Sequence, residues 1–134
     1  MMITTYQEYL QQPKSISVDK MQQLHTEILA EIADDEEAKE IYEELIVQAT
    51  RYATFRAEWL IWDRETKMER DDSRTSCHNS LIVKFNMLAR YLRMQGKAAA
   101  WRDALGYEED DRYHRKTVGD FACYLVFINS INAR

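Results

Sequence analysis

The chain has 134 residues, a net charge of −5, and only three glycines and one proline. So few turn-forming residues exclude turn-rich β-sandwiches, collagen-like repeats and Pro-rich linkers. A content of 46% hydrophobic and 31% charged residues is that of a folded protein, and the net acidity argues against a dedicated duplex-binding domain. We therefore expect a single helical domain over residues 1–134, with no nucleic-acid partner.

Apolar residues recur at helical spacing along nearly the whole chain, which predicts an all-α protein. A short first helix is predicted over residues 5–12, and a second helix begins after the capping residue Ser17. A third helix begins near Asp34, which forms a capping-box pattern with Glu37. Its apolar stripe repeats every three or four positions through Ile41, Leu45, Gln48, Tyr52, Phe55, Trp59 and Trp62.

This third helix is predicted to be the long central one. No Gly or Pro interrupts residues 34–72, so up to ~35 of them can form one helix of about 52 Å, although the charged run 63–72 also fits a frayed end or a loop. The next helix is predicted to start at Ser73, followed by a short helix over 97–105. A last helix carries Val118, Phe121, Leu125 and Ile128. The pattern predicts an antiparallel bundle of four to six helices.

The aromatic residues of the third helix predict how the protein associates. Tyr52, Phe55, Trp59 and Trp62 continue a seam of the type found in paired helices, and such a seam is rich for a monomer of this size. We expect a homodimer with these four residues at the interface. The alternatives are a ligand pocket between helices and packing within one chain.

The segment SRTSCHN holds the strongest candidates for catalysis. Arg74 and His78 are predicted to share a helix face, and a histidine beside an arginine can act as general acid and base on a phosphodiester. With the neighbouring Asn79 they resemble the Arg-x(4–6)-His motif of the HEPN family of helical ribonucleases, at a spacing one residue shorter. The resemblance implies a dimeric ribonuclease. The alternative is a packed boundary histidine, with Arg74 paired to carboxylates of residues 63–72.

The same helix also carries a basic face. Arg90, Arg93 and Lys97 lie on one side of it, which predicts a site for a small anion or a nucleotide. The alternative is a basic surface packed against an acidic one within the molecule.

Patterns for metal binding are sparse. Asp111 and His114 form one ligand-like pair, whereas a di-metal bundle needs two, and Cys77 and Cys123 lack the spacing of a zinc site. Two acidic pairs resemble the EExxE…ExxD pattern of the all-α nucleotide pyrophosphatases, which implies Mg²⁺, but on one long helix they would lie ~40 Å apart. These pairs are Glu40 with Glu43 and Glu69 with Asp72. We expect neither a metal nor a cofactor.

Residues 73–106 resemble a family of small helical proteins of unknown function from Gram-positive bacteria. The resemblance rests on an Arg-x-x-x-His-Asn start, an apolar helix and a following short segment, marked here by Arg74, His78, Asn79, Asn86, Arg90 and Trp101. It implies a helical fold and a bacterial origin, and no activity. With no apolar run long enough to span a membrane and no leader, we expect a cytoplasmic protein. The expected role is an interaction or regulatory module that acts as a homodimer without catalysis, with the HEPN-like ribonuclease and the anion binder as alternatives.

Overall fold

The computed structural model describes residues 15–59, 61–106 and 111–132, without the side chains of 111–116 and 131–132. This part of the chain forms five helices and no strand, which confirms the all-α prediction. The helices are α2 (Val18–Ile32), α3 (Glu36–Trp59), α4 (Arg64–Met94), α5 (Ala100–Ala104) and α6 (Asp111–Asn132). The helix predicted over residues 5–12 lies outside the described residues.

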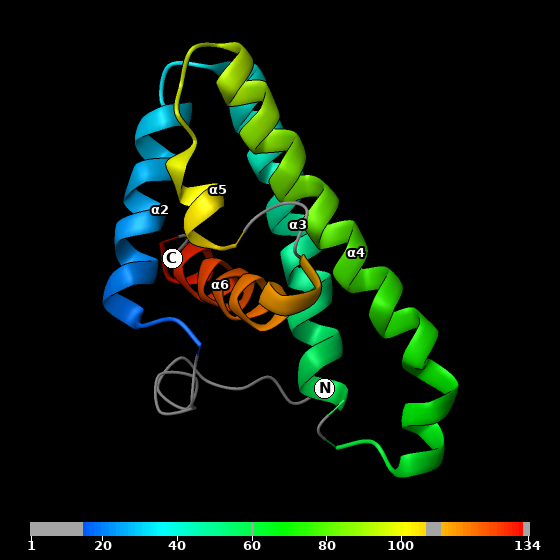
Figure 1. Ribbon diagram of the computed structural model, residues 1–134. Coiled ribbons are helices and arrows are strands. Elements are labelled where there is room, and N and C mark those ends of the chain that lie inside the picture. The colour runs from blue at the N-terminus through cyan, green and yellow to red at the C-terminus, as the bar shows by residue number, and fades with distance from the viewer. Residues whose placement is uncertain (1–14, 60, 107–110, 133–134) are drawn as a thin grey trace.

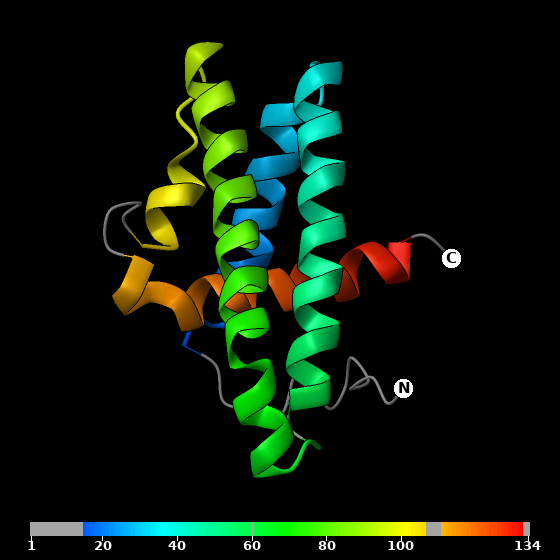
Figure 2. The same ribbon diagram turned by 90° about the vertical axis from the view of Figure 1, so that its right-hand side faces the viewer.

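Helices α3 and α4 lie side by side and run in opposite directions, so that they form a long hairpin (Figure 1). The other three described helices lie on one side of this hairpin, and α6 crosses behind both of its helices near the middle (Figure 2). This crossing differs from a regular bundle of aligned helices, so the predicted antiparallel bundle is not confirmed beyond the α3–α4 pair.

One hydrophobic core joins the five helices, because each contributes an apolar stripe or a large apolar side chain to it. The predicted stripe of α6 is confirmed, since Val118, Phe121 and Leu125 are all 0% exposed. Other fully buried members of the core are Met21, Leu24, Ile28, Leu45, Leu81, Phe85, Leu88, Leu92, Trp101 and Leu105. The core therefore lies between the hairpin and the helices on its covered side.

Residues 34–72 do not form one continuous helix, which the sequence left open, and the expectation that the third helix is the long one is wrong. α3 ends at Trp59, and the Asp63 carboxylate starts a new helix by accepting a hydrogen bond from the Thr66 N–H at 2.8 Å. α4 then runs for 31 residues, and Ser73, the predicted start, lies inside it. The charged run needs no apolar stripe to be helical, because its Arg, Glu, Lys and Met residues favour helix and follow a capped start. The long helix is therefore α4.

The caps of the first two described helices lie at or beside the predicted positions. Ser17 caps α2 as predicted, and its hydroxyl accepts a hydrogen bond from the Lys20 N–H at 3.1 Å. The cap of α3 is Asp35 rather than Asp34, since Asp35 accepts from the Ala38 N–H at 3.1 Å. Both acids are favoured N-cap residues, and only Asp34 has the Glu three residues on that completes a capping box, so the path of the turn overrides that local signal.

The end of α4 is closed by a glycine. Gly96 has φ +86°, and the N–H groups of Gly96 and Lys97 donate to the carbonyls of Arg93 and Leu92 at 3.1 and 2.9 Å. This pair of bonds is the Schellman motif, which needs a residue in the left-handed region. The predicted stop is confirmed, and the chain turns back along α2 and α4 to form α5. No described helix combines the length and apolarity that a membrane span requires.

Candidate functional site

The tip of the hairpin, where α3 passes into α4, carries a group of aromatic side chains outside the core. Phe55, Trp59 and Trp62 contact one another with ring centroids 5.3–6.3 Å apart. All three are half-buried, and none belongs to the core or to the apolar residues packed against it. We call these three residues the tip cluster.

Two arginines of α4 lie on the rings of the tip cluster. The Arg74 guanidinium carbon is 4.6 Å from the centroid of the Trp59 ring, and that of Arg70 is 5.5 Å from Trp62. These cation–π contacts hold the first turns of α4 against the end of α3. Arg74 also pairs with Asp71 at 3.7 Å, with half of its side chain exposed.

Two exposed apolar side chains lie in the same stretch of chain, Ile61 directly before Trp62 and Met68 in the second turn of α4. Ile61 is 62% exposed and Met68 is 72% exposed. Together with the cluster and its two arginines they make what we call the tip surface. Trp, Phe, Met and Arg are the residue types enriched in protein interfaces, and Trp and Arg are frequent among the residues that dominate binding energy. The tip surface therefore has the composition of a protein-binding site.

Tyr52, the fourth residue of the predicted interface, lies apart from the tip cluster. Its ring meets that of His78 edge-on at 5.6 Å, and its hydroxyl lies against Gly119 of α6. Burial raises the pKa of Tyr52 above its usual value of 10.0. The structure thus brings Phe55, Trp59 and Trp62 together at the tip and places Tyr52 where α6 crosses the hairpin.

The three predicted catalytic residues point to different surroundings. Arg74 lies on Trp59 at the tip, His78 is only 7% exposed beside Tyr52, and Asn79 is exposed on the side of α4 away from the core. This arrangement matches the alternative of a packed boundary histidine with Arg74 paired to a carboxylate of residues 63–72. Ribonuclease activity stays a prediction that the geometry does not favour.

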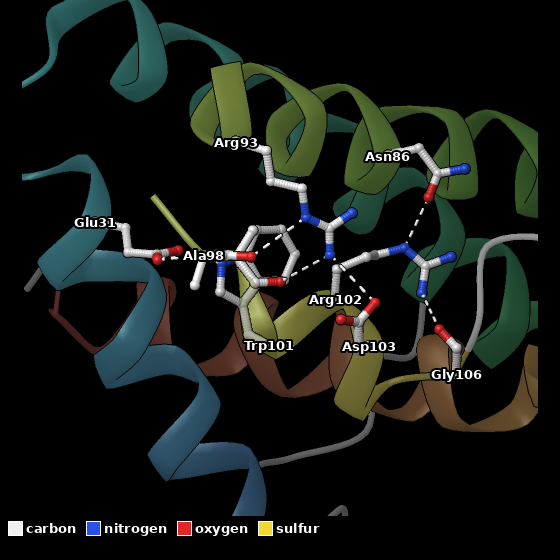
Figure 3. Close-up of polar contacts among 9 residues, drawn as sticks. Glu31, Asn86, Arg93, Ala98, Trp101, Arg102, Asp103 and Gly106 are labelled. Atoms are coloured by element: carbon white, nitrogen blue, oxygen red, sulfur yellow. Dashed lines mark hydrogen bonds and ion pairs between the residues drawn. The ribbon is translucent and has the colours of Figure 1, made fainter. Parts of the chain in front are cut away.

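Two of the predicted anion-binding residues, Arg93 and Lys97, hold the segment after α4 in place, and Figure 3 shows the contacts of Arg93. Arg93 donates to the Ala98 carbonyl at 3.2 Å and pairs with Asp103 at 3.2 Å. The Lys97 ammonium pairs with Asp34 at 3.4 Å and donates to the Glu31 carbonyl at 3.3 Å. These contacts match the alternative of a basic surface packed on acidic groups, and anion binding stays a prediction.

A buried arginine that sequence reasoning missed completes this network. Arg102 is 0% exposed, and its guanidinium donates to Asn86 at 2.7 Å and to the Gly106 carbonyl at 2.8 Å (Figure 3). Next to it, the Trp101 indole N–H donates to the Glu31 carboxylate at 2.8 Å. An arginine in a short polar helix usually indicates solvent exposure, so nothing local in the sequence reveals its burial.

A second missed group lies where α3, α6 and the start of the described chain meet. The buried carboxylate of Asp120 accepts a hydrogen bond from Arg56 at 2.8 Å and two from Ser15, each at 3.0 Å. Cys123 lies beside this pair, and burial raises the pKa of its thiol to about 11. The thiol is therefore protonated at neutral pH and is a poor nucleophile.

The metal-site patterns gain no support. In the described part of the chain, no three His, Cys, Asp or Glu side chains lie close enough together to hold a metal. The pair Glu40 and Glu43 lies near the start of α3, and the pair Glu69 and Asp72 near the start of α4, at opposite ends of the hairpin. The side chains of residues 111 and 114 lie outside the described set.

The chain matches no family model, no curated protein and no solved structure. The resemblance to a family from Gram-positive bacteria therefore stays a prediction. The function has to be argued from the geometry of the chain, and its most distinctive feature is the tip surface.

Proposed function

We propose that this protein is an interaction module, acting without catalysis, and that two copies associate through the tip surface of the α3–α4 hairpin. The observation that carries the proposal is that Phe55, Trp59 and Trp62 gather outside the hydrophobic core. Large aromatic side chains bury about 150–250 Å² each when fully enclosed, so the part of these three half-buried rings that stays accessible is apolar area that folding leaves unburied. Association buries this area.

The charges around the tip suit contact between identical surfaces. A twofold axis brings each residue of a patch near other residues of the same patch, so the patch has to be self-complementary. Acidic and basic side chains are interspersed from the N-cap through the first turns of α4: Asp63, Arg64, Glu65, Lys67, Glu69, Arg70, Asp71, Asp72 and Arg74. With signs this mixed, two tips can meet without a net repulsion, which favours a second copy of the chain as the partner.

The test is the mass of the protein in solution, measured by light scattering after size exclusion. Wild type is expected at twice the chain mass, and the double variant Ile61→Ser, Trp62→Ala at the single chain mass. The matched control is Met94→Ser, which removes an 81% exposed methionine at the other end of α4 and should leave the dimer intact.

Circular dichroism of the tip variant should match wild type, because neither substituted side chain lies in the core. A wild-type protein that is monomeric at the highest workable concentration overturns the proposal. A dimer that survives the tip substitutions overturns the assignment of the interface.

A further inference from the structure

The side of the hairpin that faces away from α2, α5 and α6 carries a groove. We call this side the outer face; it lies toward the viewer in Figure 2. Two adjoining hollows of about 540 and 430 Å³ follow the line between α3 and α4, and both are lined by Asp72, Ser76 and Ser80. We call the larger hollow the upper one and the smaller hollow the lower one. Phe55 of the tip cluster lines the lower hollow, so the groove is continuous with the tip surface.

Exposed aliphatic side chains lie along this groove. Val83 lines the upper hollow and is 53% exposed, and Met87 lies one helical turn further along α4 and is 41% exposed. On α3, Val47 is 58% exposed and lies one turn from Arg51, which lines the lower hollow. These three side chains, one on α3 and two on α4, make what we call the apolar strip of the outer face.

The charges that border this strip have opposite signs on the two helices. An ion pair of 2.9 Å between Lys84 and Glu44 fixes which residues lie level with each other. Beyond this pair, away from the tip, α3 carries Glu40 and α4 carries Arg90. Nearer the tip the signs reverse, with Arg51 on α3 and Asp72 on α4 lining the same hollow.

We propose that the outer face packs against the outer face of a second copy, with the twofold axis parallel to the hairpin. The proposal rests on the proposed function, and it states how the two copies are arranged. Rotation about this axis places α3 of each copy over α4 of the other and keeps each residue at its own level. The two tips then lie side by side at the same end, so one axis joins the tip surfaces and the outer faces.

The sign pattern selects this arrangement. In this arrangement the acidic end of α3 in one copy, with Glu40 and Glu44, lies over Lys84 and Arg90 in α4 of the other copy. Arg51 of the first copy lies toward Asp72 of the other. Val47 comes opposite Val83 at the middle of the contact. Short Ser side chains line the groove, which lets the facing helix approach closely.

The size of the outer face fits a stable dimer. α3 has 24 residues, so the face is about 36 Å long, and two helices side by side make it about 20 Å wide. The resulting area is on the order of 700 Å², close to the ~800 Å² per partner of a standard protein interface. The two helix pairs together form a four-helix arrangement of a common kind.

The test uses cysteine pairs that can form a disulfide only between copies. Val47→Cys and Val83→Cys are prepared separately, mixed so that subunits exchange, and oxidised mildly. The mixture should give a covalent dimer on non-reducing gels, while each variant alone should give little, because equivalent positions lie too far apart across the axis. Mixing Val83→Cys with Leu29→Cys, a 42% exposed position on α2, is the control and should give none.

The cysteine variants also carry Cys77→Ser, because Cys77 is buried but lines the lower hollow and could otherwise react with the new thiol of a second copy; the buried Cys123 is kept. A strong cross-link in Val47→Cys alone overturns this arrangement, because it means that α3 of one copy lies against α3 of the other. Absence of any cross-link in a protein whose dimer is lost in the tip variant overturns the outer-face contact and leaves the proposed function standing. A protein that is monomeric throughout overturns both.

Discussion

The two ends of the α3–α4 hairpin are built from different kinds of contact. At the end where α4 stops, which we call the closed end, Trp101 and Arg102 are 0% exposed and donate hydrogen bonds to α2, α4 and the Gly106 carbonyl. At the tip, Ile61 and Met68 are 62% and 72% exposed, and the aromatic rings lie outside the core. The side chains at the closed end are buried and hydrogen-bonded within the fold, whereas the tip carries large apolar side chains that lie outside the core.

This difference is informative about function because burial is the main source of folding free energy. Three large aromatic side chains that are only half-buried contribute less to the stability of the fold than they would inside the core. At the closed end, by contrast, a buried guanidinium is stable only with its acceptors in place. Substitutions should therefore act mainly on folding at one end and mainly on association at the other.

The largest effect is expected for Arg102→Ala at the closed end. The substitution removes the guanidinium donor from the part-buried Asn86 and from the buried Gly106 carbonyl, and opens a cavity beside Trp101. We expect a loss of about 2–5 kcal/mol in the free energy of unfolding, measured by urea denaturation. Arg64→Ala, an exposed position near the tip, is the control and should change stability by less than about 0.5 kcal/mol. A loss below about 1 kcal/mol for Arg102→Ala would contradict the structural role of this network.

An intermediate effect is expected midway along the hairpin, where α6 crosses it. Gly119→Ala would gain about 1 kcal/mol from helix propensity alone. Here the added methyl group overlaps the Tyr52 hydroxyl, so we expect a net loss of about 1–3 kcal/mol. The free energy of unfolding is again measured by urea denaturation. Gly119→Ala is made both in wild type and in the variant Tyr52→Phe.

Removing the Tyr52 hydroxyl should reduce the cost of Gly119→Ala. The reduction is partial, because two ring carbons of Tyr52 also lie 3.0 and 3.1 Å from the position of the new methyl group. Equal costs in the two backgrounds would mean that the hydroxyl does not set the limit.

A small effect on folding is expected at the tip for Arg74→Ala. The variant loses a cation–π contact with Trp59 at a half-exposed site, worth about 0.5–1 kcal/mol. Dimer affinity should fall by a larger factor than this stability change accounts for, as measured by sedimentation. A folding loss as large as that of Arg102→Ala would remove the difference between the two ends.

Much of the fold follows from local patterns in the sequence. The apolar stripe of α6, the Ser17 cap and the Gly96 stop all act within a few residues, and the structure has them where the patterns predict them. No Gly or Pro marks the break after Trp59, so the sequence leaves open whether one helix continues through residues 60–72. Asp63 is a favoured N-cap residue and caps α4 in the structure. Helix-favouring residues also precede it, so Asp63 alone does not mark the start of a new helix in the sequence.

The polar groups of the interior were not predictable in the same way. Asp120 is bonded to Ser15, 105 positions away, and Trp101 to Glu31, 70 positions away. Burial of a charged side chain depends on such distant partners, and its residue type alone indicates a surface position. The aromatic seam was visible in the sequence, but the division between Tyr52 and the tip cluster depends on where α6 crosses.

The last effect concerns pH and a histidine on the covered side of the hairpin. His25 of α2 is 8% exposed and contacts the Tyr124 ring at 6.3 Å, and burial lowers its pKa below the usual 6.5. Below pH 6.5 the unfolded chain binds this proton more readily than the folded chain, so stability falls as pH drops from 6.5 through the folded pKa. The contribution is at most about 1.4 kcal/mol for each pH unit in this window.

His25→Gln should remove this contribution, because glutamine does not titrate. Urea midpoints compared between about pH 7 and about pH 5.5 should fall less in the variant than in wild type. His78, also buried, remains in both proteins, so the difference between their slopes isolates His25. Parallel slopes would show that the covered side of the hairpin does not hold His25 in its neutral form.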